Sequence, residues 1–486
     1  MASEIPGQDE QVVESNNVKS ILLELQELHR LAVPKLLINI VIYVQTFVSV
    51  YFLGMLGQKE LAAGSFAVGF ANIFGYSILT GLAQGIESIC GQSFGGAKLP
   101  LLGLALQRML IIMMLCSAFL CLLWTNVVSL LSAFPGIDLD MLNSAQTYLN
   151  YSRPDLFAKS LLLPLEIFLR SQQLTQPVMY TTTFSALLHL PINFLLLYRF
   201  DMGLRGVALA MSLTDFIHIG LLSLYLQWSG ICRRTWMRLD WKVVTSLGPM
   251  LKLALNSCIA VAIEWWWYEI ILLSASFLPY SEASVASMGI LIRLTALTYM
   301  LPSSLAAAVS TRIGNELGAN KPDQARIATL AATAYSFLWA FVACSFIIAM
   351  RNSWGLWFTK DATSLDLTSK ALPVLGLCEI GNYPQTVAYG ILMGSSRPDV
   401  SVKIYFVAFY LVGLPTAMIL AFYFGVGLVG FWYGLLAAQI TCAALMLYVV
   451  LRTSWVEQAH QTQARLMASE CSHLLLPQDQ NALLLA

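Results

Sequence analysis

Residues 91–98 read GQSFGGAK, and residues 314–321 read GNELGANK. A constant offset of 223 residues relates the two segments, with these identical positions in register: Gly91 and Gly314, Gly95 and Gly318, Lys98 and Lys321. Self-similarity at a fixed offset indicates that the chain contains two related halves. Because glycine permits tight turns, we interpret both segments as turns that cap helix ends rather than as substrate contacts.

The composition places these halves in a membrane. Hydrophobic residues make up 58% of the 486 positions and charged residues only 11%, whereas soluble domains carry about 25% charged residues. The net charge is zero, which argues against nucleic acid as a partner. The nine cysteines are scattered without a CxxC pair, so we expect free thiols, with no disulfide scaffold and no metal site.

Twelve apolar runs are long enough for the roughly 20 helical residues that cross a bilayer. They lie near residues 33–53, 61–86, 104–132, 143–169, 177–198, 205–228, 250–276, 283–309, 327–350, 371–394, 402–424 and 428–451. Apolar residues at helical spacing between 18 and 31 predict an amphipathic helix before the first run. We therefore expect an all-α polytopic membrane protein with twelve transmembrane helices.

A basic connection, Ser229–Ser246, divides the twelve spans into two sets of six. The predicted divisions are an N-terminal segment, a first lobe, a linker, a second lobe and a tail, at residues 1–32, 33–228, 229–249, 250–454 and 455–486. Six is an even number, so both lobes cross the membrane in the same direction. That arrangement predicts a parallel pseudo-twofold axis along the membrane normal and a central cleft, which transporters use for alternating access.

Basic residues predict the orientation, because cytoplasmic loops carry an excess of Lys and Arg. With the N-terminus inside, the inner segments hold 18 of these residues and the outer segments 6. Both termini are therefore expected in the cytoplasm. In the tail, Glu470 precedes Leu474 and Leu475 in an acidic dileucine pattern, and we expect either the plasma membrane or a vacuolar or late-endosomal membrane.

The seventh span contains a carboxylate in an apolar helix, Glu264 within AVAIEWWWYEIIL at 260–272. A charge at the centre of a membrane helix costs roughly 2.5–3.5 kcal/mol on insertion scales, so such a residue is a functional candidate by default. Glu264 is a candidate for binding and releasing a proton; the alternative is a hydrogen bond that only packs two helices. Trp265 and Tyr268 are candidates for the wall of an aromatic pocket, which suits flat organic solutes and attracts cations.

Three segments together resemble the multidrug and toxic compound extrusion (MATE) transporters, in particular the plant Detoxification branch. They are ESICGQSFG at 87–95, EWW at 264–266 and STRIGNELGAN at 310–320. The resemblance extends from about residue 30 to residue 455. It implies twelve helices in two lobes and export of organic solutes in exchange for protons, with no cofactor besides the proton gradient.

In this family, a glutamate of span seven and an aspartate of span ten form the coupling site, and Glu264 matches the first. Span ten reads LCEIGNYPQ, and alignment on Gln385 places Asn382 where the resemblance implies aspartate. Glu379 lies three residues before Asn382, on the same helix face. We expect either that Glu379 has taken over the carboxylate role or that coupling depends on Glu264 alone. Gln385 is a candidate for the substrate pocket.

Arg293 in span eight is a second departure from the family. At 1.5 Å per residue, Arg293, Glu264 and Asn382 lie roughly 15–19 Å from the outer ends of their helices. An intramembrane arginine needs a partner. Arg293 is therefore expected to clamp Glu264 or Glu379, to meet an anionic group of the substrate, or to extend into a water-filled cleft.

Other polar residues in the spans are weaker candidates. Glu87 lies near the inner end of span two, where we favour a structural role at the helix end. Asp155 and Lys159 in span four have the i,i+4 spacing of an intrahelical ion pair. Asp215 in span six is a candidate for a proton site in the first lobe.

The sequence predicts a monomeric secondary transporter that exchanges protons for small organic solutes, xenobiotics or plant secondary metabolites, across a lipid bilayer. Glu264 would bind the proton, with help from Glu379 or Asn382. One alternative is a carrier of organic anions or hormones that uses Arg293 and is weakly coupled or uncoupled. A solute-sensing receptor and an intramembrane enzyme are alternatives of another class. The sequence contains no HExxH or GxGD arrangement that would favour the enzyme.

Overall fold

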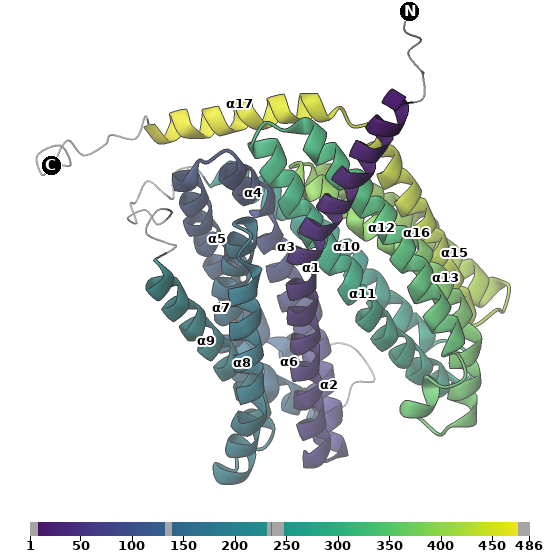
Figure 1. Ribbon diagram of the computed structural model, residues 1–486. Helices are drawn as coiled ribbons and strands as arrows, with labels where there is room; N and C mark the ends of the chain where they lie inside the picture. The colour runs from purple at the N-terminus through teal and green to yellow at the C-terminus, as the bar shows by residue number, and fades with distance from the viewer. Residues whose placement is uncertain (1–7, 132–138, 231–234, 236–246, 475–486) are drawn as a thin grey trace, which may run out of the picture. The chain divides into compact units, whose positions relative to one another are not determined.

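The computed structural model describes residues 8–131, 139–230, 235 and 247–474, and in these ranges the chain is helical without a β-strand (Figure 1). Each of the twelve predicted spans falls on a helix or on consecutive helical segments, so the all-α prediction is confirmed. Within the described ranges, ten helices are long and apolar enough to cross a membrane.

The first six predicted spans correspond to α1 (Gln8–Leu56), α2 with η1, α3 and α4 (Gln58–Ala71, Asn72–Tyr76, Ser77–Gln84, Glu87–Gly95), α5 with α6 (Leu99–Thr125, Val127–Leu131), α7 (Leu139–Ser171), α8 with η2 (Thr175–Phe194, Leu195–Arg199) and α9 (Leu204–Ser229). The other six correspond to α10 (Gly248–Ala275), α11 (Ser281–Gly318), α12 (Pro322–Ala349), α13 (Ala362–Gly394), α14 with η6, α15 and η7 (Pro398–Tyr405, Phe406–Gly413, Leu414–Met418, Ile419–Tyr423) and α16 (Leu428–Leu451). A short η5 (Gly355–Trp357) and a C-terminal α17 (Trp455–Leu474) complete the described elements.

The contacts of the chain form two compact units. The first unit holds residues 37–266 and the described part of 460–486; the second unit holds the described part of 1–36 and residues 267–459. The chain passes from one unit to the other inside α1, α10 and α17. The predicted lobes, 33–228 and 250–454, differ from this division in α10, because residues 250–266 of the predicted second lobe lie in the first unit. The lobe boundaries stay a prediction.

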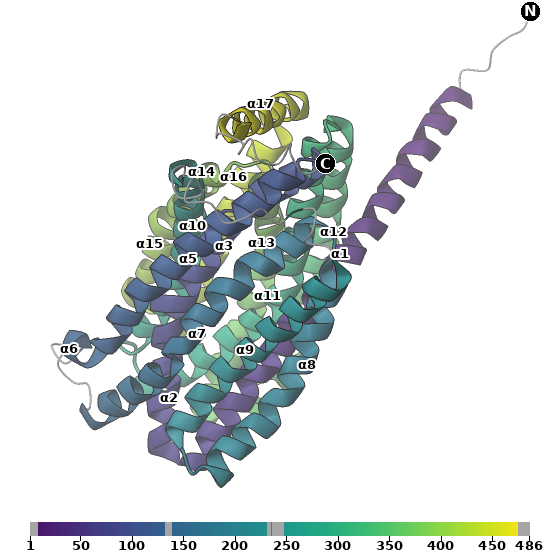
Figure 2. The same ribbon diagram turned by 90° about the vertical axis from the view of Figure 1, so that its left-hand side faces the viewer.

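In each unit, one predicted span is not among the ten helices that are apolar enough to cross a membrane, and this span lies among several neighbours. In the first unit α7 packs against α5, α9, α2 and α3, and Figure 2 shows it between α5 and α9. In the second unit α13 packs against α11, α12 and α16. These two are the predicted spans that are missing from the ten apolar helices. Because protein surrounds them, α7 and α13 can carry polar side chains that lipid would penalise.

The internal repeat is also present in the backbone. Among the described residues, the non-glycine residues with left-handed φ angles include Ala97 and Asn320, 223 positions apart, and Gln173 and Ser396, also 223 apart. The π-helical segments η2 and η7 begin 224 positions apart. The two halves therefore repeat each other's irregularities as well as their helices.

The turns of the GQSFGGAK and GNELGANK segments are helix C-caps. The amide of Lys98 donates to the carbonyl of Ser93 at 2.8 Å, and the amide of Lys321 donates to the carbonyl of Glu316 at the same distance. These bonds, with a left-handed residue before each lysine, form the Schellman motif that ends a helix. The geometry fits the helix-capping interpretation of the paired segments.

Candidate functional site

A buried carboxylate on α13 is held by two hydrogen-bond donors. Glu379 is 1% exposed. The hydroxyl of Thr298 on α11 donates to Oε1 of Glu379 at 2.8 Å, and the side-chain amide of Asn382 donates to Oε2 at 2.8 Å. All three residues belong to the second unit. The structure therefore brings Glu379 and Asn382 together, as their spacing of three residues suggested.

The neighbourhood of Glu379 is polar but lacks a positive charge. Asn382 is 1% exposed, and its backbone carbonyl accepts a hydrogen bond of 2.8 Å from the hydroxyl of Thr386. Tyr383 donates its hydroxyl to the carbonyl of Thr298 at 3.2 Å. Among the described residues, no lysine, arginine or histidine forms an ion pair with Glu379. An ionised Glu379 would have hydrogen bonds but no counter-ion, which is costly in a low-dielectric interior.

Glu264 is the second buried carboxylate of the predicted site. It lies on α10 in the first unit, with only 7% of its surface exposed. The residues that follow it circle the helix: Trp265 is 37% exposed and Trp266 is 39% exposed, whereas Trp267 is fully buried. The aromatic run therefore has an exposed side and a buried side. Trp265 lies on the exposed side.

Tyr268 and Gln385 both lie in the second unit. Tyr268 is partly exposed and packs edge-on against Trp267, with ring centroids 5.7 Å apart. Trp267 in turn packs against Phe409, with centroids 6.1 Å apart. Gln385 is completely buried on α13, six residues after Glu379. Tyr268 therefore keeps an exposed part, whereas Gln385 is covered by protein.

Arg293 lies on the exposed side of α11. It forms no ion pair among the described residues. The expected clamp between Arg293 and Glu379, which share the second unit, is therefore absent from this structure. An exposed, uncompensated guanidinium in a membrane helix leaves a solute anion or a water-filled cleft as its expected environment.

Glu87 forms a buried ion pair with Arg170, which joins α4 to α7. Both side chains are less than 10% exposed. This geometry fits the structural role that the sequence favoured for Glu87. Asp215 on α9 also has a partner, because Lys159 on α7 contacts its carboxylate at 2.5 Å. The prediction that Lys159 pairs with Asp155 on its own helix is therefore wrong: its ion pair crosses to α9.

Two hydroxyl groups of these clusters were not found from the sequence. Thr298 donates to Glu379, and Tyr76 donates to Asp155 at 2.6 Å. Threonine and tyrosine are common in apolar spans and carry no charge, so nothing in their local sequence marks them. The repeat is the only available signal: its offset of 223 relates Tyr76 to Tyr299, the neighbour of Thr298.

Comparisons with known proteins agree with this architecture. The MatE family model matches residues 34–195 and 257–419, which are more than half of the chain. Protein DETOXIFICATION 48 of Arabidopsis thaliana is 43% identical over 442 residues, covering 91% of this chain and 83% of the relative. Protein DETOXIFICATION 51 of Arabidopsis thaliana is 44% identical over 440 residues, covering 90% of this chain and 82% of the relative.

A solved structure matches nearly the whole fold. The crystal structure of the eukaryotic MATE transporter AtDTX14 superposes with a TM-score of 0.88 at 28% sequence identity, covering 92% of this chain and 99% of that one. MATE transporter structures have twelve helices in two lobes, so this match confirms the predicted fold class. The sequence matches to the plant proteins confirm the expected plant Detoxification relationship. The chain therefore belongs to the MatE family and is a multi-pass membrane efflux transporter rather than an enzyme.

Proposed function

We propose that this transporter exports small organic solutes from the cytosol in exchange for protons, and that Glu264 and Glu379 carry the protons. The observation that supports this role most directly is the environment of Glu379. Two donors stabilise the charged carboxylate, and no cation among the described residues neutralises it. When water leaves the surroundings of such a carboxylate, the protonated form becomes more favourable than the charged form. A proton affinity that changes between two conformations is what coupling to alternating access requires.

Asn382 acts in this proposal as a positioning residue. Its amide donates to Glu379, so it orients the carboxylate that replaces the family's aspartate one turn away. Proton uptake from the acidic side by Glu264 and Glu379 favours solute release, and proton release toward the cytosol resets the carrier. One pH unit is worth about 1.4 kcal/mol per proton, which is roughly a tenfold solute gradient.

The solutes would be xenobiotics or plant secondary metabolites, and Trp265, Tyr268 and Gln385 are the residues proposed to bind them. We favour flat aromatic solutes, because these side chains offer ring faces with few fixed polar groups. A second candidate function follows from Arg293, whose exposed guanidinium has no ion-pair partner in the described residues. It supports a carrier of organic anions with weak or no proton coupling.

The cellular setting is part of the same proposal. The basic-residue asymmetry favours cytoplasmic termini. The proposal also includes a monomer in the plasma membrane or in a vacuolar or late-endosomal membrane. Glu470, the acid of the dileucine pattern, forms an ion pair with Lys98 at 2.7 Å. The second leucine of that pattern, Leu475, lies outside the described residues.

Proteoliposomes with an imposed pH gradient test the function. A panel of cationic, neutral and anionic aromatic solutes is compared in the parent protein, Glu264→Gln, Glu379→Gln and the control Glu282→Gln. Glu282 is an exposed carboxylate in the first turn of α11. We expect uphill flux in the parent and the control, and only downhill flux in the other two. Undiminished uphill flux in both Glu264→Gln and Glu379→Gln would disprove proton coupling through these residues.

A further inference from the structure

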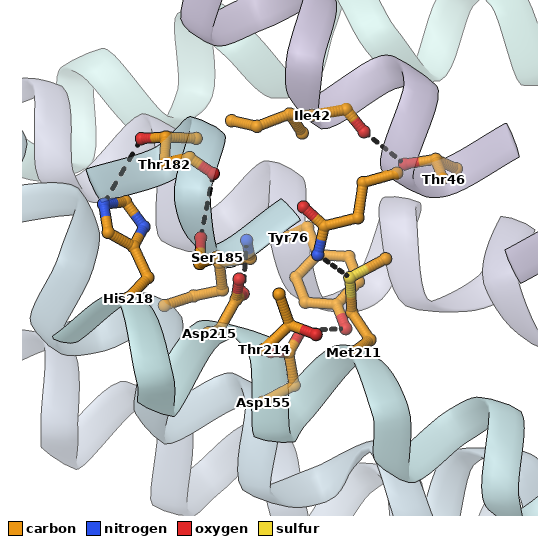
Figure 3. A network of polar contacts seen from close by, with 12 residues as sticks. Ile42, Thr46, Tyr76, Asp155, Thr182, Ser185, Met211, Thr214, Asp215 and His218 are labelled. Atoms are coloured by element: carbon orange, nitrogen blue, oxygen red, sulfur yellow. Dashed lines mark hydrogen bonds and ion pairs between the residues drawn. The ribbon is translucent and has the colours of Figure 1, made fainter. Parts of the chain in front are cut away.

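A second polar cluster lies inside the first unit and has no part in the coupling proposed above (Figure 3). Tyr76 of η1 donates its hydroxyl to Oδ2 of Asp155 on α7 at 2.6 Å. One turn further along α7, Lys159 contacts Oδ2 of Asp215 on α9 at 2.5 Å. Asp155 is 1% exposed and Asp215 is 5% exposed. We call these four residues the first-unit cluster.

The charges of the first-unit cluster do not balance. Two carboxylates, Asp155 and Asp215, interact with each other and with one ammonium, that of Lys159. If all three groups are ionised, the cluster carries one net negative charge in the interior of a membrane protein. Neighbouring groups do not remove it: Tyr148 of α7 and Tyr76 are neutral phenols at neutral pH, and Glu166 of α7, which also acts on Lys159, brings no positive charge.

The nearest histidine does not supply the missing positive charge. His189 of α8 faces Asp215. Nε2 of His189 lies 3.0 Å from the amide nitrogen of Asn193 and 2.9 Å from the hydroxyl of Ser49, and Nδ1 lies 2.9 Å from the hydroxyl of Thr214. Because an amide nitrogen can only donate, the contact with Asn193 is a hydrogen bond when Nε2 accepts. An imidazole that accepts at one nitrogen is neutral. His218 of α9 lies further along, against the hydroxyl of Thr182 at 3.3 Å, and α5 contributes the hydroxyl of Ser117, which donates to the carbonyl of Leu156.

One carboxylate oxygen of the cluster, Oδ1 of Asp155, could carry a proton. Oδ1 of Asp155 is buried and accepts no hydrogen bond from any described residue. A buried carboxylate oxygen without a donor is costly, whereas a protonated carboxyl group uses that oxygen to donate. With a proton shared between Asp155 and Asp215, the cluster would be neutral and Oδ1 would be satisfied.

The repeat relates this cluster to the one around Glu379. In each unit, a hydroxyl from the span-two or span-eight helix donates to a carboxylate on the central polar helix, Tyr76 to Asp155 and Thr298 to Glu379. With the offset of 223, Lys159 occupies the position of Asn382. The two clusters differ in the rest: the offset takes Asp155 to Cys378, and Lys159 contacts Asp215 on α9, whereas Asn382 donates to Glu379 on its own helix.

We propose that the first-unit cluster is a second proton-binding site, at which Asp155 and Asp215 together hold one proton at neutral pH. A metal ion fits less well, because the ammonium of Lys159 already occupies the carboxylates. In addition, the described residues contain no group of three or more His, Cys, Asp or Glu side chains arranged to hold a metal ion. The inference rests on the proposed function only where it adds a proton to the transport cycle; the proton itself binds whether or not export is coupled.

Infrared spectroscopy of the purified, reconstituted protein counts the proton directly through the carbonyl stretching band of protonated carboxyl groups. The measurement uses a Glu264→Gln/Glu379→Gln background, so that the outcome does not depend on the proposed coupling residues. Charge balance predicts one protonated carboxyl in this parent and none in Asp155→Asn. It predicts two in Lys159→Met and one again in the double variant Asp155→Asn/Lys159→Met. Asp140→Asn, an exposed carboxylate at the start of α7, is the control and leaves the band unchanged.

The predicted numbers of protonated carboxyl groups in the parent, Asp155→Asn, Lys159→Met and the double variant are one, none, two and one. These numbers distinguish a proton site from a structural ion pair. If the parent has no such band at neutral pH, or if Asp155→Asn and Lys159→Met leave its area unchanged, the proposal is wrong. If sodium chloride abolishes the band at constant pH where choline chloride does not, the resident ion is sodium, and the proton site is also refuted. Asp215→Asn has the same predicted count as Asp155→Asn and replaces it if that variant does not fold, as judged by gel filtration.

Discussion

The side chain of Asn382 donates its hydrogen bond to the carboxylate of Glu379, 2.8 Å away on the same helix. The residue at the family's aspartate position is therefore a donor to an acid one turn earlier. A hydrogen bond to a charged group is worth roughly 1.5–3 kcal/mol, which corresponds to tenfold or more in an equilibrium. We predict that Asn382→Leu slows uphill solute flux by about tenfold or more in proteoliposomes. Asn382→Asp keeps substantial flux, because it restores a carboxylate. Equal flux in Asn382→Leu and the parent would remove Asn382 from the site.

Arg293 and Arg312 provide a matched comparison on one helix, α11. Arg312 forms ion pairs with Glu24 at 2.8 Å and with Glu316 at 2.9 Å, whereas Arg293 is exposed and forms none among the described residues. We predict that Arg293→Gln leaves the thermal unfolding temperature in detergent unchanged and lowers the flux of anionic solutes relative to cationic ones. Arg312→Gln should lower the unfolding temperature. A large loss of stability in Arg293→Gln would show that the guanidinium has a structural partner.

The buried pair of Glu87 and Arg170 joins α4 to α7. Breaking a buried pair by removing one partner costs about 3–5 kcal/mol, whereas replacing both with apolar residues is often neutral. We predict a strongly reduced unfolding temperature for Arg170→Met and its recovery in Glu87→Leu/Arg170→Met. Thermal unfolding followed by size-exclusion chromatography measures both variants. If the double variant unfolds at as low a temperature as the single variant, the prediction is wrong, and the two side chains stabilise the fold by more than neutralising each other's charge.

Gly390 lies where the backbones of α13 and α11 approach each other closely. A Cβ atom at this position would lie 2.4 Å from the backbone carbonyl oxygen of Ala306, and backbone cannot move aside as a flexible side chain does. Overpacking of this kind costs about 1–3 kcal/mol. We predict that Gly390→Ala lowers the unfolding temperature. Gly289→Ala on α11, where a Cβ meets nothing within 4 Å, should keep or raise it. Equal stability of the two variants would contradict the close approach.

Asp361 caps the N-terminus of α13, outside the membrane spans. Its carboxylate accepts from the amide of Ser364 at 2.8 Å and from the hydroxyl of the same residue at 2.7 Å. These bonds hold the pKa of Asp361 below its ordinary value of 3.8. A depressed folded-state pKa stabilises the fold above the unfolded pKa, and this contribution is lost as the pH falls through the folded pKa.

The expected result is a pH-dependent difference between Asp361→Ala and the parent. At neutral pH the variant should unfold at a lower temperature, and the difference should shrink as the pH is lowered below about 4, near the ordinary aspartate pKa. Asp366→Ala serves as the control, because Asp366 forms an exposed pair with Lys370, and such surface pairs contribute little. A difference that stays constant with pH would show that the carboxylate charge is not what caps the helix.

The sequence predicts this protein well where the chemistry is local. Hydropathy and length locate the twelve helices, and the spacing of three residues places Glu379 beside Asn382 on one face of α13. The constant offset of 223 reveals the duplication. Each of these signals depends on periodicity along the chain, which a single sequence contains.

The contacts between helices are harder to predict. The i,i+4 spacing suggested a pair between Asp155 and Lys159, yet the lysine contacts Asp215 on α9, because its long side chain can cross to a neighbouring helix that the sequence does not locate. The hydroxyl groups of Tyr76 and Thr298 were also not predicted, because each contacts a carboxylate on another helix. The amphipathic helix predicted before the first span and the span itself form one continuous helix, α1, with Pro34 inside it. The helix boundary that the sequence suggested between them is therefore absent.

Helices α7 and α13, the two predicted spans outside the ten apolar helices, have a consequence for how the protein is made. A segment enters the bilayer unaided when its own side chains favour lipid over water, and the charges of these two segments oppose that transfer. We therefore expect each segment to remain beside the translocon until neighbouring helices such as α5 or α11 shield it. The residues proposed to handle protons thus make biogenesis dependent on neighbouring segments, and replacing them with leucine should speed membrane integration while abolishing transport.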